Sequence, residues 1–134
     1  MKFDEMLASQ KKVRRKPRDE EHRLQAACVK WFRLKYRNMA SVLFAVPNGN
    51  KRTARNGAYM NEEGMLSGVA DLILLKSNRF YGGLAIEMKT KKGRQEESQK
   101  AWQKECEANG NKYVICRSFD DFRREIDMYV KDMD

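Results

Sequence analysis

The feature that most constrains the fold is a pair of short, strongly apolar segments in the middle of the chain. They are "VADLILL" at residues 69–75 and "LAIEMKT" at residues 84–90, connected by "KSNRFYGG". Apolar runs of this length, bounded by turn residues, predict two strands that pair in the antiparallel direction. They are too apolar for a solvated sheet edge, so we expect helices to cover both faces of the sheet.

Apolar residues at helical spacing predict three helices around these strands. The first starts at Asp19 and ends before "RNMAS", and the apolar residues that recur along it at helical spacing are Leu24, Ala27, Cys28, Trp31, Phe32 and Leu34. The second presents Gln95, Gln99, Trp102 and Cys106 on one face and closes at Asn109-Gly110. The third follows a Ser118 cap, with Asp121 in the position that a capping box requires.

Two more strands are predicted at "SVLFAV" (41–46) and "KYVIC" (112–116). The resulting order is helix, strand, strand, strand, helix, strand, helix. This order predicts an α/β fold with a small mixed β-sheet flanked by α-helices. We expect one domain over residues 19–134, preceded by a basic arm at residues 1–18 that is either a solvated tail or a contact for phosphates.

The charge balance favours a polyanionic partner. The 134 residues carry a net charge of +9, which suits nucleic acid or an anionic membrane surface. No apolar run is long enough to span a bilayer, and the N-terminal residues lack the apolar stretch of a secretory signal. The expectation is therefore a cytoplasmic protein without a membrane segment.

Cysteine and histidine are too few and too scattered for several kinds of site. Cys28, Cys106 and Cys116 are far apart and form no C-x-x-C pair, which predicts reduced, mostly buried thiols rather than disulfides or a zinc knuckle. His22 is the single histidine, so two-histidine nuclease chemistry is excluded. Any chemistry here must use carboxylates, lysines or a hydroxyl.

One group of charged residues lies within the apolar strands. Glu87 and Lys89 project from the same face of their strand, and antiparallel pairing can bring Asp71 beside Glu87. Two adjacent carboxylates repel each other unless a cation lies between them, and Mg²⁺ is commonly held by one or two carboxylates. Lys89 would then position a water or neutralise charge on a phosphate. The alternative is a cross-strand salt bridge on a solvated face.

At these residues the chain resembles a known group of enzymes. An Asp followed by E-x-K on adjacent strands is similar to the PD-(D/E)xK nuclease superfamily. More narrowly, the chain resembles a stand-alone VRR-NUC domain of the phage and bacterial type. The resemblance runs from Glu20 to Val130, through "EEHRLQAACVKWFR", "VPNGN", "GMLSGVADLILL", "GLAIEMKTKKGRQEESQKAW" and "YVICRSFDDFRREIDMYV". It implies a restriction-endonuclease-like fold, and it departs from the family at Ala70, where proline is frequent.

The resemblance also implies roles for individual residues. Asp71, Glu87 and the backbone carbonyl of Met88 would bind Mg²⁺ or Mn²⁺. Glu21 in the first helix would complete the metal site, with the adjacent Glu20 as an open alternative. Lys89 would be the catalytic lysine, and Gln99 would hydrogen-bond a water or a phosphate oxygen. No small-molecule cofactor is implied.

The implied activity is metal-dependent, structure-selective endonuclease cleavage of branched DNA, such as a Holliday junction or a flap, by a homodimer. Basic residues near the site would supply phosphate contacts; they are Lys51, Arg52, Arg55, Lys91, Lys92 and Arg94. Three alternatives stay open: an inert nucleic-acid-binding module, a sequence-specific restriction-type nuclease on the same fold, and a membrane-surface binder.

Overall fold

The two apolar segments form the centre of a four-stranded sheet. The computed structural model describes residues 17–47 and 61–133 of the chain. The strands lie side by side in the order β1 (Leu43–Ala45), β2 (Leu72–Leu74), β3 (Leu84–Met88) and β4 (Lys112–Cys116). β2 runs antiparallel to β1 and β3, whereas β3 and β4 are parallel. The mixed sheet and the antiparallel pairing of the two apolar segments are therefore confirmed.

The register of the central strands decides which side chains share a face. Leu72 pairs with Ile86, and Leu74 pairs with Leu84. One step beyond the Leu72–Ile86 pair, Asp71 stands opposite Glu87. Because side chains alternate across a strand, Asp71, Ala85 and Glu87 face one side of the sheet while Leu72 and Ile86 face the other.

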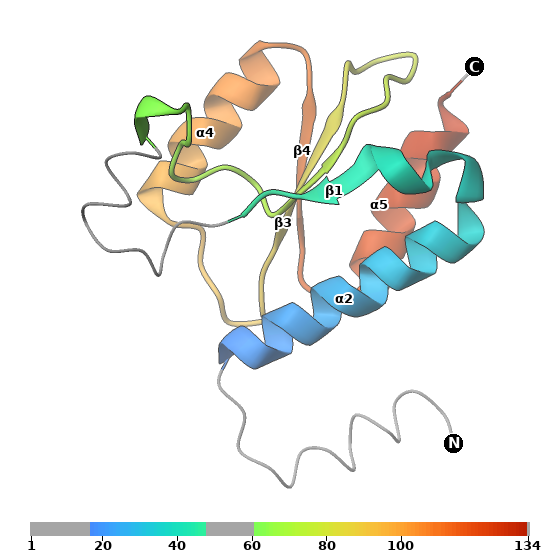
Figure 1. Cartoon of the computed structure of the whole chain (residues 1–134), viewed down its shortest axis with the longest axis horizontal. Coiled ribbons are helices and arrows are strands. Elements are labelled where there is room, and N and C mark those ends of the chain that lie inside the picture. The colour runs from blue at the N-terminus through green and yellow to red at the C-terminus, as the bar shows by residue number, and fades with distance from the viewer. Residues whose placement is uncertain (1–16, 48–60, 134) are drawn as a thin grey trace, which may run out of the picture.

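Helices α2 (Pro17–Lys35) and α5 (Phe119–Lys131) cover one face, and α4 (Glu97–Ala108) covers the other, as Figure 1 shows. The larger core lies between the sheet and helices α2 and α5, where Cys28, Phe32, Phe122 and Ile126 pack against the strands. The smaller core under α4 contains Ala70, Ala85, Cys106 and Tyr113, with Trp102 packed against it. Helices on both faces were predicted, and they are confirmed.

The first helix and strand differ in detail from the prediction. α2 begins at Pro17, two residues before the expected start, because proline is tolerated in the first turn of a helix. Leu34 is 62% exposed, so it does not share the buried face of Cys28 and Phe32. A 3₁₀ helix, η1 (Arg37–Val42), was missed, and it shortens the predicted strand 41–46 to Leu43–Ala45.

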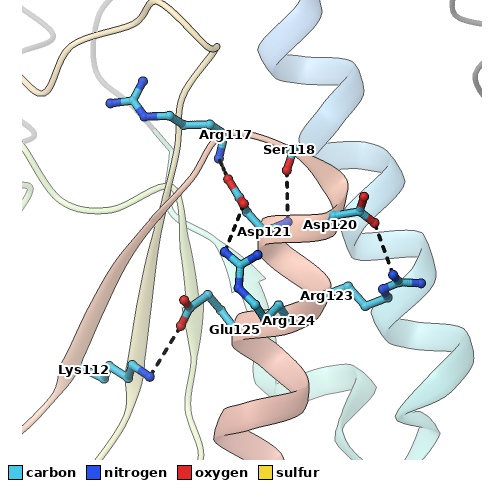
Figure 2. A network of polar contacts seen from close by, with 8 residues as sticks. All are labelled: Lys112, Arg117, Ser118, Asp120, Asp121, Arg123, Arg124 and Glu125. Carbon is cyan, nitrogen blue, oxygen red and sulfur yellow. Dashed lines mark hydrogen bonds and ion pairs between the residues drawn. The ribbon is translucent and has the colours of Figure 1, made fainter.

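The start of α5 confirms the cap but not the capping box. The Ser118 hydroxyl accepts a hydrogen bond of 3.0 Å from the Asp121 N–H (Figure 2). The Asp121 carboxylate accepts from the N–H of Arg117 rather than from that of Ser118. The pKa of Asp121 is lowered chiefly by this bond to the Arg117 N–H. In a capping box the Asp121 carboxylate would accept from the Ser118 N–H; here it accepts from the N–H of Arg117, one residue earlier.

Two other expectations concern the thiols and the membrane. Cys28, Cys106 and Cys116 are free and buried, as predicted. Burial raises the pKa of the Cys28 and Cys116 thiols to about 12.

Among the described helices, none combines the length and the apolar character needed to cross a bilayer.

Candidate active site

The candidate site lies where β2 begins and β3 ends. The Asp71 carboxylate accepts a hydrogen bond of 2.7 Å from the Met88 N–H, which ties the start of β2 to the end of β3. The backbone carbonyl of Asp71 accepts from the Val46 N–H at 2.9 Å, next to β1. The Glu87 side chain is in hydrogen-bonding contact with Asp71. The two acids that the sequence placed on adjacent strands thus lie together.

A polar cavity of about 220 Å³ opens beside these two acids. Five residues singled out from the sequence line it, and they are Glu21, Asp71, Glu87, Lys89 and Gln99. Ser67, Gly68, Val69, Glu96 and Ser98 complete the wall. Three parts of the chain therefore meet at this cavity: the start of α2, the strands β2 and β3, and the start of α4 with the loop that precedes β2.

The site buries ionisable groups that act on one another. Glu87 is 1% exposed and Lys89 is 8% exposed, so neither lies on a solvated face and the solvated salt bridge is wrong. Burial and the neighbouring Asp71 raise the pKa of Glu87, while Lys89 opposes the shift. The pKa of Glu21 is raised by burial and then by Asp71, and lowered by Lys89. Asp71 and Lys89 therefore both influence the pKa of Glu87 and that of Glu21.

The donor chemistry of this site fits a hard divalent cation. Asp71 and Glu87 offer carboxylate oxygens, which Mg²⁺ and Mn²⁺ prefer, and no histidine or cysteine lines the cavity. Burial is the main cause of the raised pKa of Glu87, and a cation between the two acids would remove the further contribution of Asp71. Within residues 17–47 and 61–133, no three His, Cys, Asp or Glu side chains form a group able to hold an ion. Glu21 lines the cavity without joining Asp71 and Glu87 in such a group.

The structure gives two site residues structural contacts as well. Gln99 is buried, and its side-chain oxygen accepts a hydrogen bond of 2.8 Å from the Glu96 N–H at the start of α4. The amide NH₂ of Gln99 is the part left to donate into the cavity. The N–H of Met88 is bonded to Asp71, which holds the backbone where the predicted carbonyl ligand lies. The exposed Glu20 does not line the cavity.

Gly68 allows the loop before β2 to approach α4. Its φ of +87° lies in the left-handed region, and a Cβ placed there would be 2.3 Å from the Ser98 carbonyl oxygen. Only glycine combines that conformation with so close an approach. Gly68 therefore permits the wall of the cavity that the loop forms with Ser98 and Gln99.

Sequence reasoning missed a chain of hydrogen bonds behind Glu87. The Tyr113 hydroxyl donates to Glu87 Oε1 at 3.3 Å, and Gln95 Nε2 lies 3.2 Å from that hydroxyl. Gln95 also donates to Gln103 at 2.8 Å. Alternation along "KYVIC" indicates the face on which Tyr113 lies, but only the parallel register of β4 against β3 brings it to Glu87.

The predicted phosphate contacts are described only in part. Lys91, Lys92 and Arg94 are exposed on the turn that follows Lys89. Arg117 holds this turn, since its Nη1 donates to the carbonyls of Thr90 at 2.8 Å and Gly93 at 2.5 Å. In Figure 2 its guanidinium points away from α5. Lys51, Arg52, Arg55 and residues 1–16 of the basic arm lie outside the described residues.

Comparison with known proteins bears on the family and the fold of the chain. The profile of the VRR-NUC domain family matches residues 8–120. A solved structure named "VRR_NUC domain protein" superimposes with a TM-score of 0.75 at 21% identity, covering 91% of this chain and 94% of its own. No curated protein is significantly similar to the sequence. Because the family match spans most of the sequence and the fold agrees, the chain belongs to the VRR-NUC domain family, which is of nuclease type.

Proposed function

We propose that this nuclease domain is a metal-dependent endonuclease that hydrolyses DNA phosphodiesters at the cavity beside β2 and β3. The observation that carries the proposal is the contact between the Asp71 and Glu87 carboxylates, with the buried Lys89 lining the same polar cavity. A structural salt bridge needs one acid for one lysine. Two acids in contact inside a cavity are better explained by a cation that both of them bind.

Asp71 and Glu87 would hold Mg²⁺ or Mn²⁺, with the Met88 carbonyl and Glu21 as the further ligands. When bound, such an ion activates a water for attack and neutralises charge on the phosphate. Glu21 is partly exposed on α2. A change in its side-chain conformation would bring it toward Asp71 and Glu87 without any movement of the strands.

Lys89 would act on the reacting phosphate. Its ammonium group lies in a buried, polar cavity, where a charge stabilises developing negative charge more strongly than it does in water. It would also orient the attacking water. The amide NH₂ of Gln99 would donate a hydrogen bond to that water or to a phosphate oxygen.

The substrate we propose is branched DNA, either a Holliday junction or a flap. Lys91, Lys92 and Arg94 are exposed shortly after Lys89 in the chain and would contact phosphates without reading sequence. Lys51, Arg52 and Arg55 would add to this set. The net charge of +9 agrees with a polyanionic substrate, and the cytoplasm is where such a substrate would be met.

A substrate panel tests the proposal. Wild-type protein and Asp71→Ala are incubated with a four-way junction, a 5′ flap, splayed arms and plain duplex, each with Mn²⁺ or EDTA. We expect cleavage of branched substrates by the wild type with Mn²⁺ only, and none by Asp71→Ala. Binding of all four DNAs without any cleavage would instead identify an inert binding module. Discrete fragments from plasmid DNA would identify a sequence-specific nuclease.

A further inference from the structure

The hydrogen bond between Tyr113 and Glu87 comes from a residue to which the proposed reaction assigns no role. Tyr113 is buried on β4, and its hydroxyl donates to Glu87 Oε1 at 3.3 Å. Its ring packs in the smaller core, with the Trp102 ring tilted at 56° and 6.1 Å between centroids. The ring is therefore held by packing from α4, and its hydroxyl meets the carboxylate from a fixed direction.

A second contact decides which way the hydroxyl donates. A tyrosine hydroxyl has a single hydrogen to donate and can accept as well. Gln95 Nε2 is a donor, so the hydroxyl accepts from Gln95 at 3.2 Å and gives its own hydrogen to Glu87. Gln95 is in turn held by the Gln103 side-chain oxygen on α4 at 2.8 Å. The hydrogen bonds thus run in one direction, from Gln95 through Tyr113 to Glu87.

We propose that Tyr113, oriented by Gln95, is a positioning residue for Glu87. It holds one carboxylate oxygen in place so that the other stays available to a divalent cation shared with Asp71. The inference rests on the proposed function, because it gives Glu87 a cation to bind. Outer partners of this kind orient metal-binding carboxylates, and their loss weakens metal affinity about 10- to 100-fold.

The competing explanation is that Tyr113 only fills space under α4. Tyr113→Phe separates the two explanations, because it keeps the packed ring and removes the hydroxyl alone. Tyr129→Phe is the matched control, since Tyr129 is also buried and its hydroxyl donates to the Lys76 carbonyl in another part of the fold. Gln95→Met is a second variant that leaves Tyr113 itself intact.

The test measures Mn²⁺ binding to the full chain without DNA by isothermal titration calorimetry. We expect Tyr113→Phe to bind Mn²⁺ about tenfold or more weakly, and Gln95→Met to be weakened in the same direction by less. The Mn²⁺ concentration for half-maximal cleavage should rise in parallel. DNA affinity in EDTA should stay at the wild-type value, because Tyr113 is buried and is not one of the proposed phosphate contacts.

Each outcome bears on the inference. Equal Mn²⁺ affinity in wild type and Tyr113→Phe overturns it and leaves the proposed function standing. An equal loss in Tyr129→Phe also overturns it, since general loosening would then explain the effect. If Tyr113→Phe does not fold, unchanged Mn²⁺ binding by Gln95→Met overturns it. If the wild type neither binds Mn²⁺ nor cuts DNA, the proposed function fails and this inference fails with it.

Discussion

At the scale of single residues, Lys89 is the cation that lines the cavity beside the acidic side chains. A lysine that is 8% exposed needs charged or polar partners to offset its desolvation. Here it partly offsets the rise that burial and Asp71 cause in the pKa of both Glu87 and Glu21. The lysine thus lines the same cavity as the acids, where the proposed reaction would use it.

Replacing Lys89 should separate catalysis from binding. We expect Lys89→Ala to cut branched DNA about 100-fold or more slowly, because it removes a charge placed to stabilise the transition state. Mn²⁺ and DNA binding should be retained, since Lys89 is neither a proposed metal ligand nor one of the proposed DNA-binding residues. Single-turnover cleavage rates measure this, with the exposed Lys76→Ala as the matched control. Wild-type rates in Lys89→Ala would remove this residue from the mechanism.

Gly68 offers a second test at this scale, because the chain contains a matched glycine. Gly64 and Gly68 both have positive φ, but a Cβ on Gly64 would meet nothing within 4 Å. Alanine at either position should lose about 1–2 kcal/mol from backbone strain. Gly68→Ala should lose more and cut DNA more slowly, because the Ser98 carbonyl must move. Urea unfolding of both variants measures the difference; equal losses would show that the close contact is unimportant.

At the scale of elements, β3 and the turn after it connect the cavity to the proposed DNA contacts. β3 is buried along its whole length between β2 and β4. Directly after Lys89, the turn that carries Lys91 and Lys92 is held by the Arg117 guanidinium, which reaches it from the end of β4. The position of the basic turn therefore depends on a residue distant in sequence.

Arg117→Ala should release this turn. Two backbone carbonyls would lose a charged donor, so we expect the free energy of unfolding to fall by about 1–3 kcal/mol. DNA affinity should weaken severalfold while Mn²⁺ affinity is unchanged, because the acids keep their own contacts. Fluorescence anisotropy and calorimetry measure the two. Arg123→Ala, which breaks an exposed ion pair with Asp120, is the control. Unchanged DNA affinity in Arg117→Ala would show that the turn does not contact DNA.

At the scale of the whole molecule, the described residues of each chain form one candidate active site, whereas resolving a four-way junction needs two cuts. A two-fold homodimer supplies two equivalent sites. We therefore expect size-exclusion chromatography with light scattering to give twice the mass of the chain, with or without a four-way junction. A monomer under both conditions would contradict this prediction.

Much of the fold and part of the site could be predicted from local pattern. The apolar segments at 69–75 and 84–90 predicted the central antiparallel strands, and alternation predicted that Glu87 and Lys89 share a face. The exposure of Leu34 and the 3₁₀ helix after α2 could not be predicted, because both depend on how α2 meets the sheet. The contact of Tyr113 with Glu87 depends on the parallel register of β4.

The sequence by itself determined the class of fold and the chemical types at the site. Strand alternation and helical periodicity are local properties, and Asp71, Glu87 and Lys89 can be recognised from the sequence alone. The tertiary structure decided how these groups are used. It placed Glu87 against Asp71, gave it a hydrogen bond from Tyr113, and closed the cavity with Gly68 and α4. These contacts join residues far apart in the chain, so they exist only once the strands have taken their register and α4 has packed.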